Sequence, residues 1–252
     1  MKRITSIARH IAFALCAALS ATLFSGCVSV NFSPLWGDGV TGSGSLEAYN
    51  FSVGEITDIK VQLHCDINYY SSPSDTVKLE IQPNLCEYIS VEESGGVLTV
   101  RATRNINWSG KTPVLTVGAS TLNSLSLAGA GVFTAHDTIT ADSFALSVDG
   151  AGKGIAELDV INLSVNMTGA ASFELRGRAD VADINLAGAG TAEALSLQTR
   201  DATINISGVG TVKLSCSENL SINAGGMGTV EYKGSPSVSL DNDGLVSVKK
   251  VG

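Results

Sequence analysis

A short motif repeats along the chain from about residue 121, and this repeat limits the fold more than any other feature. Each unit has an apolar–polar–apolar triplet, one further residue and a glycine-rich corner, and the first triplet is Leu125-Ser126-Leu127. Seven such triplets begin 16 to 21 residues apart, and a second short alternating strand follows most corners. One triplet buries too little apolar surface to be stable alone, but copies stacked about 4.8 Å apart form a continuous core.

The length of the repeat selects one architecture. Roughly 19 residues per unit fit one coil of a parallel β-solenoid, whereas a propeller blade needs ~40. Helical periodicity is nearly absent, and Val, Ile, Thr, Ser and Gly are abundant, so we predict an all-β fold. We expect about seven short glycine-cornered coils over residues 121–248, after longer strands over residues 44–120.

The corners require glycine either for a positive φ or for close approach of the next coil. After Gly152 the pattern is irregular (Lys153-Gly154-Ile155), which indicates a local bulge or an inserted residue. The glycines predicted to shape the corners are Gly129, Gly131, Gly150, Gly152, Gly169, Gly188, Gly190, Gly208, Gly210, Gly226 and Gly228.

The polar residue inside four consecutive triplets is asparagine. These residues are Asn166, Asn185, Asn205 and Asn223. One interpretation is a polar stripe that contacts a ligand. The interpretation we favour is a structural ladder of side-chain amide hydrogen bonds on the outer face of a sheet.

The first residues predict export and lipid attachment. Lys2 and Arg3 begin a basic region, an uncharged apolar stretch follows, and Leu23–Gly26 lead into Cys27. This order is typical of a lipoprotein signal, in which the cysteine receives a diacylglycerol and cleavage follows Gly26; an ordinary signal peptide cleaved nearby is the alternative. The membrane is therefore an expected partner through the N-terminal lipid.

This signal sets the domain boundaries that we expect. Residues 1–26 would be the signal peptide, residues 27–43 a lipidated tether, and residues 44–248 a single β-solenoid domain. Without the signal, 13 basic and 24 acidic residues remain, a net charge of −11. Such an acidic body excludes nucleic acid as an electrostatic partner. The location predicted is the bacterial cell envelope, at the outer membrane, on either its periplasmic or its surface side.

Three cysteines remain after the signal and the lipid site. Cys65 and Cys86 are 21 residues apart, which matches one coil and could place them on adjacent rungs, so a disulfide between them is a candidate. Cys216 would then be a free, buried thiol.

The order of motifs resembles a known family. Gly42-Ser43-Gly44 opens the region, Gly95–Val100 forms an alternating block, and Leu122–Leu127 leads into Gly129-Ala130-Gly131. This order is similar to the bacterial family named putative auto-transporter adhesin, head GIN domain (also domain of unknown function 2807), over residues 42–246. The resemblance implies a right-handed parallel β-helix in envelope proteins that are often lipoproteins, and it brings no established catalytic residues.

The sequence offers little chemistry for catalysis, and we predict no metal or cofactor. Only His64 and His136 lie beyond the signal, far apart in the chain. Glu174 and Glu193 are 19 residues apart and could form a carboxylate pair on adjacent coils, as a glycan-cleaving enzyme requires. The interpretation we favour is a charge ladder that continues to Lys213 and Glu231.

These observations favour a non-catalytic envelope lipoprotein that acts as an adhesin or as a glycan- or protein-binding β-solenoid. Two alternatives remain open: a polysaccharide-cleaving enzyme on a β-helix, and a structural or regulatory partner of another envelope protein. The sequence leaves the ligand and the oligomeric state undetermined.

Overall fold

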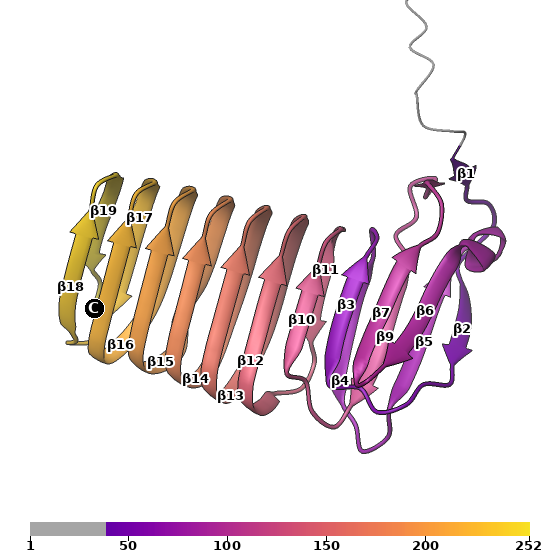
Figure 1. The fold of residues 1–252 in the computed structure, drawn as a ribbon, viewed down its shortest axis with the longest axis horizontal. Helices are drawn as coiled ribbons and strands as arrows, with labels where there is room; N and C mark the ends of the chain where they lie inside the picture. The colour runs from indigo at the N-terminus through magenta and orange to yellow at the C-terminus, as the bar shows by residue number, and fades with distance from the viewer. Residues whose placement is uncertain (1–38) are drawn as a thin grey trace, which may run out of the picture. The chain divides into compact units, whose positions relative to one another are not determined.

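The computed structural model of the protein describes residues 39–252, and it consists almost entirely of β-strands (Figure 1). The predicted lipid site Cys27, the signal peptide and most of the tether lie outside the described residues. Among the helices of the described part, none is long and apolar enough to cross a membrane. Within this part, β1 pairs with β8, and the other 17 strands form one continuous hydrogen-bonded sheet.

The repeat region folds into stacked coils, as Figure 1 shows, so the predicted all-β solenoid is confirmed. Each coil runs through one sheet, turns at the glycine corner and returns through a second sheet, and consecutive coils pair in parallel. The strands are β10 (Ser124–Leu127), β11 (Ala130–Ala135), β12 (Ile139–Val148), β13 (Ala151–Met167), β14 (Ala170–Leu186), β15 (Ala189–Ile206), β16 (Val209–Ala224), β17 (Met227–Lys233), β18 (Ser237–Asn242) and β19 (Leu245–Lys250).

Residues before the repeat add coils in an order that differs from the order along the chain. The coil of β3 and β4 lies between the coil of β7 and β9 and the coil of β10 and β11. Between β9 and β10 the chain therefore passes back over the coil of β3 and β4 before the repeat begins. The strands are β1 (Val40–Thr41), β2 (Glu47–Phe51), β3 (Asp58–Gln62), β4 (Asp66–Ser71), β5 (Thr76–Ile81), β6 (Ile89–Ser94), β7 (Val97–Ala102), β8 (Ile106–Asn107) and β9 (Val114–Ala119), with the 3-10 helix η1 at Pro83–Tyr88.

Antiparallel strands close this end of the stack. β5 pairs with β9, β2 pairs with β5, and β6 pairs with β7, all antiparallel. A parallel stack exposes a row of unpaired N–H and C=O groups at each end. At this end the antiparallel strands cover β9 and β7, and β2 and β6 become the outermost strands. The longer strands of residues 44–120 thus both start the stack and cap it.

Two sheets face each other across the core. The asparagine sheet consists of β3, β7, β10, β18 and the C-terminal halves of β12 to β16, and the glutamate sheet consists of β4, β9, β11, β17, β19 and the N-terminal halves of β13 to β16. Leu125, Leu146, Val165 and Ile184 form one inward column of the asparagine sheet and are almost fully buried. Full burial of such a side chain stabilises the fold by roughly 1.5–3 kcal/mol.

The predicted bulge after Gly152 is absent, and its position has a packing reason. β13 pairs with β14 in continuous register there, and Gly154 lies between Phe133 and Phe173 in one inward column. A Cβ on Gly154 would meet the ring of Phe173 and the backbone oxygen of Phe133. Two phenyl rings one coil above and below leave room for no side chain between them. Packing therefore explains the irregular sequence after Gly152. The register shifts lie elsewhere: in the pairing of β14 with β15 beyond Glu174, and in the pairing of β15 with β16 beyond Ala194.

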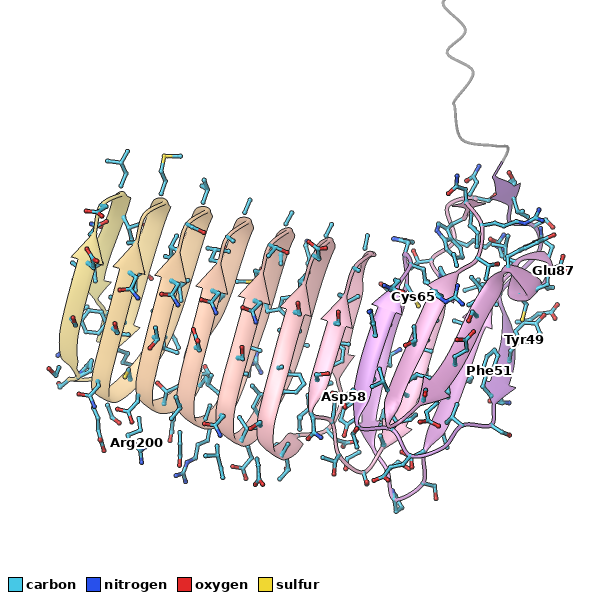
Figure 2. All side chains as sticks on the ribbon, in the orientation of Figure 1. Tyr49, Phe51, Asp58, Cys65, Glu87 and Arg200 are labelled. Atoms are coloured by element: carbon cyan, nitrogen blue, oxygen red, sulfur yellow. The ribbon has the colours of Figure 1, made fainter. Side chains whose placement is uncertain are left out.

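The predicted disulfide is not formed, because the 21-residue spacing of Cys65 and Cys86 does not correspond to one coil. Cys65 is buried between β3 and β4, whereas Cys86 lies in η1, outside the stack; Figure 2 shows Cys65 well apart from Glu87, the neighbour of Cys86. Cys65, Cys86 and Cys216 are all free thiols. Burial raises the pKa of the Cys65 thiol to about 12, so it stays protonated and unreactive in the folded chain.

Candidate binding surface

The four predicted asparagines form a continuous chain of side-chain hydrogen bonds on the outer face of the asparagine sheet. The Nδ2 of Asn185 donates to the Oδ1 of Asn166 at 3.0 Å, and the Nδ2 of Asn205 donates to the Oδ1 of Asn185 at 2.7 Å. The Nδ2 of Asn223 then donates to the Oδ1 of Asn205, also at 2.7 Å. These amides pair with each other along the stack, which is what a structural ladder requires.

A second outward row runs beside this ladder and consists mainly of small polar residues. Together the two rows make a sheet surface with few bulky side chains, visible along the asparagine sheet in Figure 2. In coil order the second row is Asp58, Ser124, Ala145, Ser164, Asp183, Thr203, Ser221 and Ser239. Ala145 is the one apolar member, so the row lacks a polar side chain at that coil.

A depression of about 690 Å³ lies around Ala145, and we call it the central groove. Its floor and walls carry amide, hydroxyl and carboxylate groups from four consecutive coils, together with Val181, which is 37% exposed. Hydroxyl-rich ligands bind through such groups, with an apolar contact for the C–H face of a ring. The polar residues lining it are Asn123, Asp142, Ser143, Asn162, Ser164 and Asp183.

The carboxylate pair considered from the sequence is present but neutralised by cations. Glu174 and Glu193 are rung partners on the glutamate sheet. Arg176 binds Glu174 through Nε at 2.9 Å, and Lys213 binds Glu193 at 2.9 Å and Glu231 at 3.9 Å. The hydrogen bond and negative charge of Glu193 raise the pKa of Lys213. This pattern matches the charge ladder that we favoured.

The side chains of His64 and His136 each contact polar or aromatic side chains close to them. The ring of His136 stacks on Tyr70 with centroids 4.4 Å apart, and its Nε2 lies 3.0 Å from the Oδ1 of Asn68. The Nε2 of His64 lies 3.2 Å from the Oγ1 of Thr112. Within residues 39–252, no group of three or more His, Cys, Asp or Glu side chains is arranged to hold a metal ion.

Close approach of neighbouring coils explains the corner glycines at Gly188 and Gly208. Neither has a positive φ. A Cβ on Gly188 would overlap the carbonyl oxygen of Gly169, and a Cβ on Gly208 would overlap that of Gly188. Of the two reasons considered from the sequence, steric exclusion by the preceding coil is therefore the one that applies here.

The central groove was not predicted from the sequence. All of its lining residues except Asn123 lie inside β12, β13 and β14, near the points where the rung pairing skips a residue. The only signal is Ala145, the apolar residue in an otherwise polar row, and a single alanine in a strand carries little information by itself.

The fold and this surface define a class: a β-solenoid with a capped first end, one flat polar sheet and a hollow in that sheet. The chain belongs to the family described as putative auto-transporter adhesin, head GIN domain, whose sequence model matches residues 55–236. The family membership indicated by the motif order is therefore confirmed.

Solved structures share this fold. A putative adhesin from Bacteroides fragilis is 24% identical with a TM-score of 0.78, over 84% of this chain and all of that one. A putative lipid binding protein from Parabacteroides distasonis is 20% identical with a TM-score of 0.65, over 85% of this chain and all of that one. At these identities the likeness establishes the fold alone. No curated protein matches the chain.

Proposed function

We propose that the protein is a non-catalytic, adhesin-like lipoprotein of the cell envelope that binds glycan chains on its asparagine sheet, centred on the central groove. The observation that carries this proposal is the groove itself, in which Asn162, Ser164 and Asp183 line a hollow within a flat polar sheet. A regular surface that repeats at each coil suits a ligand that also repeats, such as a polysaccharide. Membership of an adhesin-named family supports the same role.

The proposal predicts binding without cleavage. In a panel of immobilised polysaccharides, the full-length chain should bind at least one member, and incubation with the panel should release no reducing ends. Glu174 forms an ion pair with Arg176, so it is a poor general acid or nucleophile. Release of reducing ends by the wild type that Glu174→Gln abolishes would contradict the proposal and favour the glycan-cleaving alternative.

Lipid attachment at Cys27 is a separate part of the proposal. The supporting observation is the basic region, the apolar stretch and Gly26-Cys27 in the sequence. Intact-mass analysis of protein extracted from bacterial membranes should show a chain that begins at Cys27 and carries acyl groups, whereas Cys27→Ser should be released into the soluble fraction. An unmodified mature terminus in the membrane extract would refute the anchor.

A protein partner is the second candidate, because one edge of the stack carries exposed apolar side chains. The residues that begin the strands after the last three corners are Val209, Met227 and Leu245, which are exposed rung neighbours. Exposed apolar residues in a row are a common feature of protein-binding surfaces. Absence of binding to every polysaccharide in the panel would favour this candidate over the glycan proposal.

A further inference from the structure

Among the strands of residues 39–252, none covers the last coil in register, unlike the first. Within this range β18 pairs in register with β16, and β19 with β17 (Figure 1). The inward residues Val238 and Leu240 of β18 are 39% and 50% exposed. Their rung partners Leu220 and Ile222, which the last coil covers, are 1% and 0% exposed. On the β18 side, the end of the stack therefore exposes part of the apolar core to solvent, whereas the inward Val246 of β19 is only 7% exposed.

The same inward residues carry unpaired backbone groups. In a parallel sheet a residue gives its N–H and its C=O to the same neighbour, and successive residues alternate between the two neighbours. The N–H of Asp149 donates to the C=O of the inward Leu127 in the preceding coil, so inward residues pair with the coil that follows. No coil follows β18 within the described chain, so Val238 and Leu240 keep free N–H and C=O groups.

The second strand of the last coil has the same property. The N–H of Val251 donates to the C=O of Tyr232 and the N–H of Leu245 to that of Gly226, which places the even-numbered residues of β17 against β19. By the same alternation Val246 and Val248 direct their backbone groups to the open side, where the C=O of Val246 accepts a hydrogen bond from the Nδ2 of Asn242 at 3.0 Å. Two strand edges and an apolar strip between them are a template for further strands.

We propose that the open end binds the open end of a second copy of this chain, tail to tail, as a two-fold symmetric dimer. The first end terminates in the antiparallel strands β2 and β6, whereas the last coil ends in an open parallel coil, so the matching surface for one open end is the open end of another copy. A two-fold axis normal to both sheets makes β18 antiparallel to β18 of the second copy and β19 antiparallel to its β19. An interface of this kind is closed and uses the same surface on both copies.

One register satisfies both strand edges at once. An axis through Ser239 places Val238 opposite Leu240 of the second copy, so residues with free backbone groups and inward apolar side chains meet as hydrogen-bonded pairs. An axis through Ser247 places Val246 opposite Val248 of the second copy, whose main chain would replace the Asn242 side chain at the C=O of Val246. Ser239 and Ser247 are each four residues from Asp243 at the corner, so a single axis can pass through both.

The outward residues are also complementary in this register. Asp241 lies opposite Ser237 of the second copy, a carboxylate opposite a hydroxyl donor. Leu245, which is 76% exposed, lies opposite Lys249 of the second copy, whose aliphatic stem can cover it. The dimer would also place the two asparagine sheets side by side, which doubles the length of the polar surface and allows bivalent binding to one polymer.

The interface is small, because each copy contributes two strands of six residues. Its area lies at the low end of specific interfaces, and we expect a weak dimer that a covalent link can capture. Ser239 of one copy lies directly opposite Ser239 of the other in a non-hydrogen-bonded pair, with about 4.5 Å between Cα atoms. This spacing permits a disulfide.

The test is oxidation of the purified full-length chain carrying Ser239→Cys, followed by non-reducing electrophoresis and intact-mass analysis. The matched control is Ser221→Cys, the same outward row one coil inward, where the second copy cannot reach. We expect a covalent dimer from Ser239→Cys at least about 10-fold more abundant than from Ser221→Cys or the wild type. Equal yields from the two variants, or ladders of higher oligomers, would overturn the proposal.

A second variant tests whether the covalent dimer depends on this register or on nonspecific association of exposed apolar residues. Adding Leu240→Lys to Ser239→Cys places a charge in the contact and should reduce the covalent dimer at least about 10-fold. Val209 is 49% exposed, close to the 50% of Leu240, but lies away from the open end. Adding Val209→Lys to Ser239→Cys should therefore leave the yield of covalent dimer unchanged. Loss of the dimer with both substitutions would refute the interface. None of these results depends on glycan binding.

Discussion

Replacing Gly188 or Gly208 by alanine should lower the free energy of unfolding by more than about 2 kcal/mol. The new Cβ would overlap the carbonyl oxygen of the corner glycine one coil earlier. That oxygen cannot move away freely, because it accepts a hydrogen bond from the following coil: the N–H of Ala189 binds the oxygen of Gly169 at 3.0 Å. Equilibrium unfolding in guanidinium chloride, followed by circular dichroism, measures the change.

Gly225 provides a matched control for these substitutions. Gly225 lies next to the corner glycine Gly226, yet a Cβ on Gly225 would meet no atom within 4 Å, and its φ is not positive. Gly225→Ala should therefore change the free energy of unfolding by less than about 0.5 kcal/mol. If Gly188→Ala were as mild as Gly225→Ala, close approach of the coils could not be the reason for glycine at the corners.

Phe173→Ala should destabilise the fold by about 3–5 kcal/mol, because it leaves a cavity between two column neighbours that are too small to fill it. Phe173 is 1% exposed, and its neighbours in the column are Gly154 on one side and Ala192 on the other. Thermal and chemical unfolding of the purified variant measure this change.

Gly154, the rung partner of Phe173, allows this prediction to be tested by a double-mutant cycle. Gly154→Ala alone should cost about 1–3 kcal/mol, because the methyl group presses on the ring of Phe173. In the Phe173→Ala variant the same methyl group enters the space that the ring has left, so its cost should fall by at least about 1 kcal/mol. Additive effects would show that the two residues do not share this space.

The repeat region could be predicted because its signals are local and periodic. An apolar–polar–apolar triplet such as Ile184-Asn185-Leu186 fixes which side chains point inward, and Gly188 fixes the turn that follows. Each coil pairs with the next one along the chain, so the spacing of the motif gives the register directly. The stacking of Asn185 on Asn166 follows from that register.

The order of the first coils, the cysteine pairing and the packing at Gly154 depend on contacts between residues far apart in the sequence, which the repeat does not indicate. Asp58 pairs with Val97 on one side and with Ser124 on the other, so the order of the first coils is set by distant segments. The disulfide prediction was wrong for this reason, since it treated the segment from Cys65 to Cys86 as one coil of the later kind. The bulge prediction was wrong because Gly154 is explained by Phe133 and Phe173, which lie one coil away on either side.

The measurement that tests the functional account most directly compares the two sheets. Ser164→Ile fills the central groove with a side chain that cannot hydrogen-bond, and Ser172→Ile makes the same change at an exposed outward position of the glutamate sheet. Isoleucine favours strands, so both variants should fold. Calorimetric titration with the polysaccharide that the wild type binds best should show at least about 10-fold weaker binding for Ser164→Ile and unchanged binding for Ser172→Ile. Binding that is absent in the wild type, or lost only with Ser172→Ile, would contradict the account.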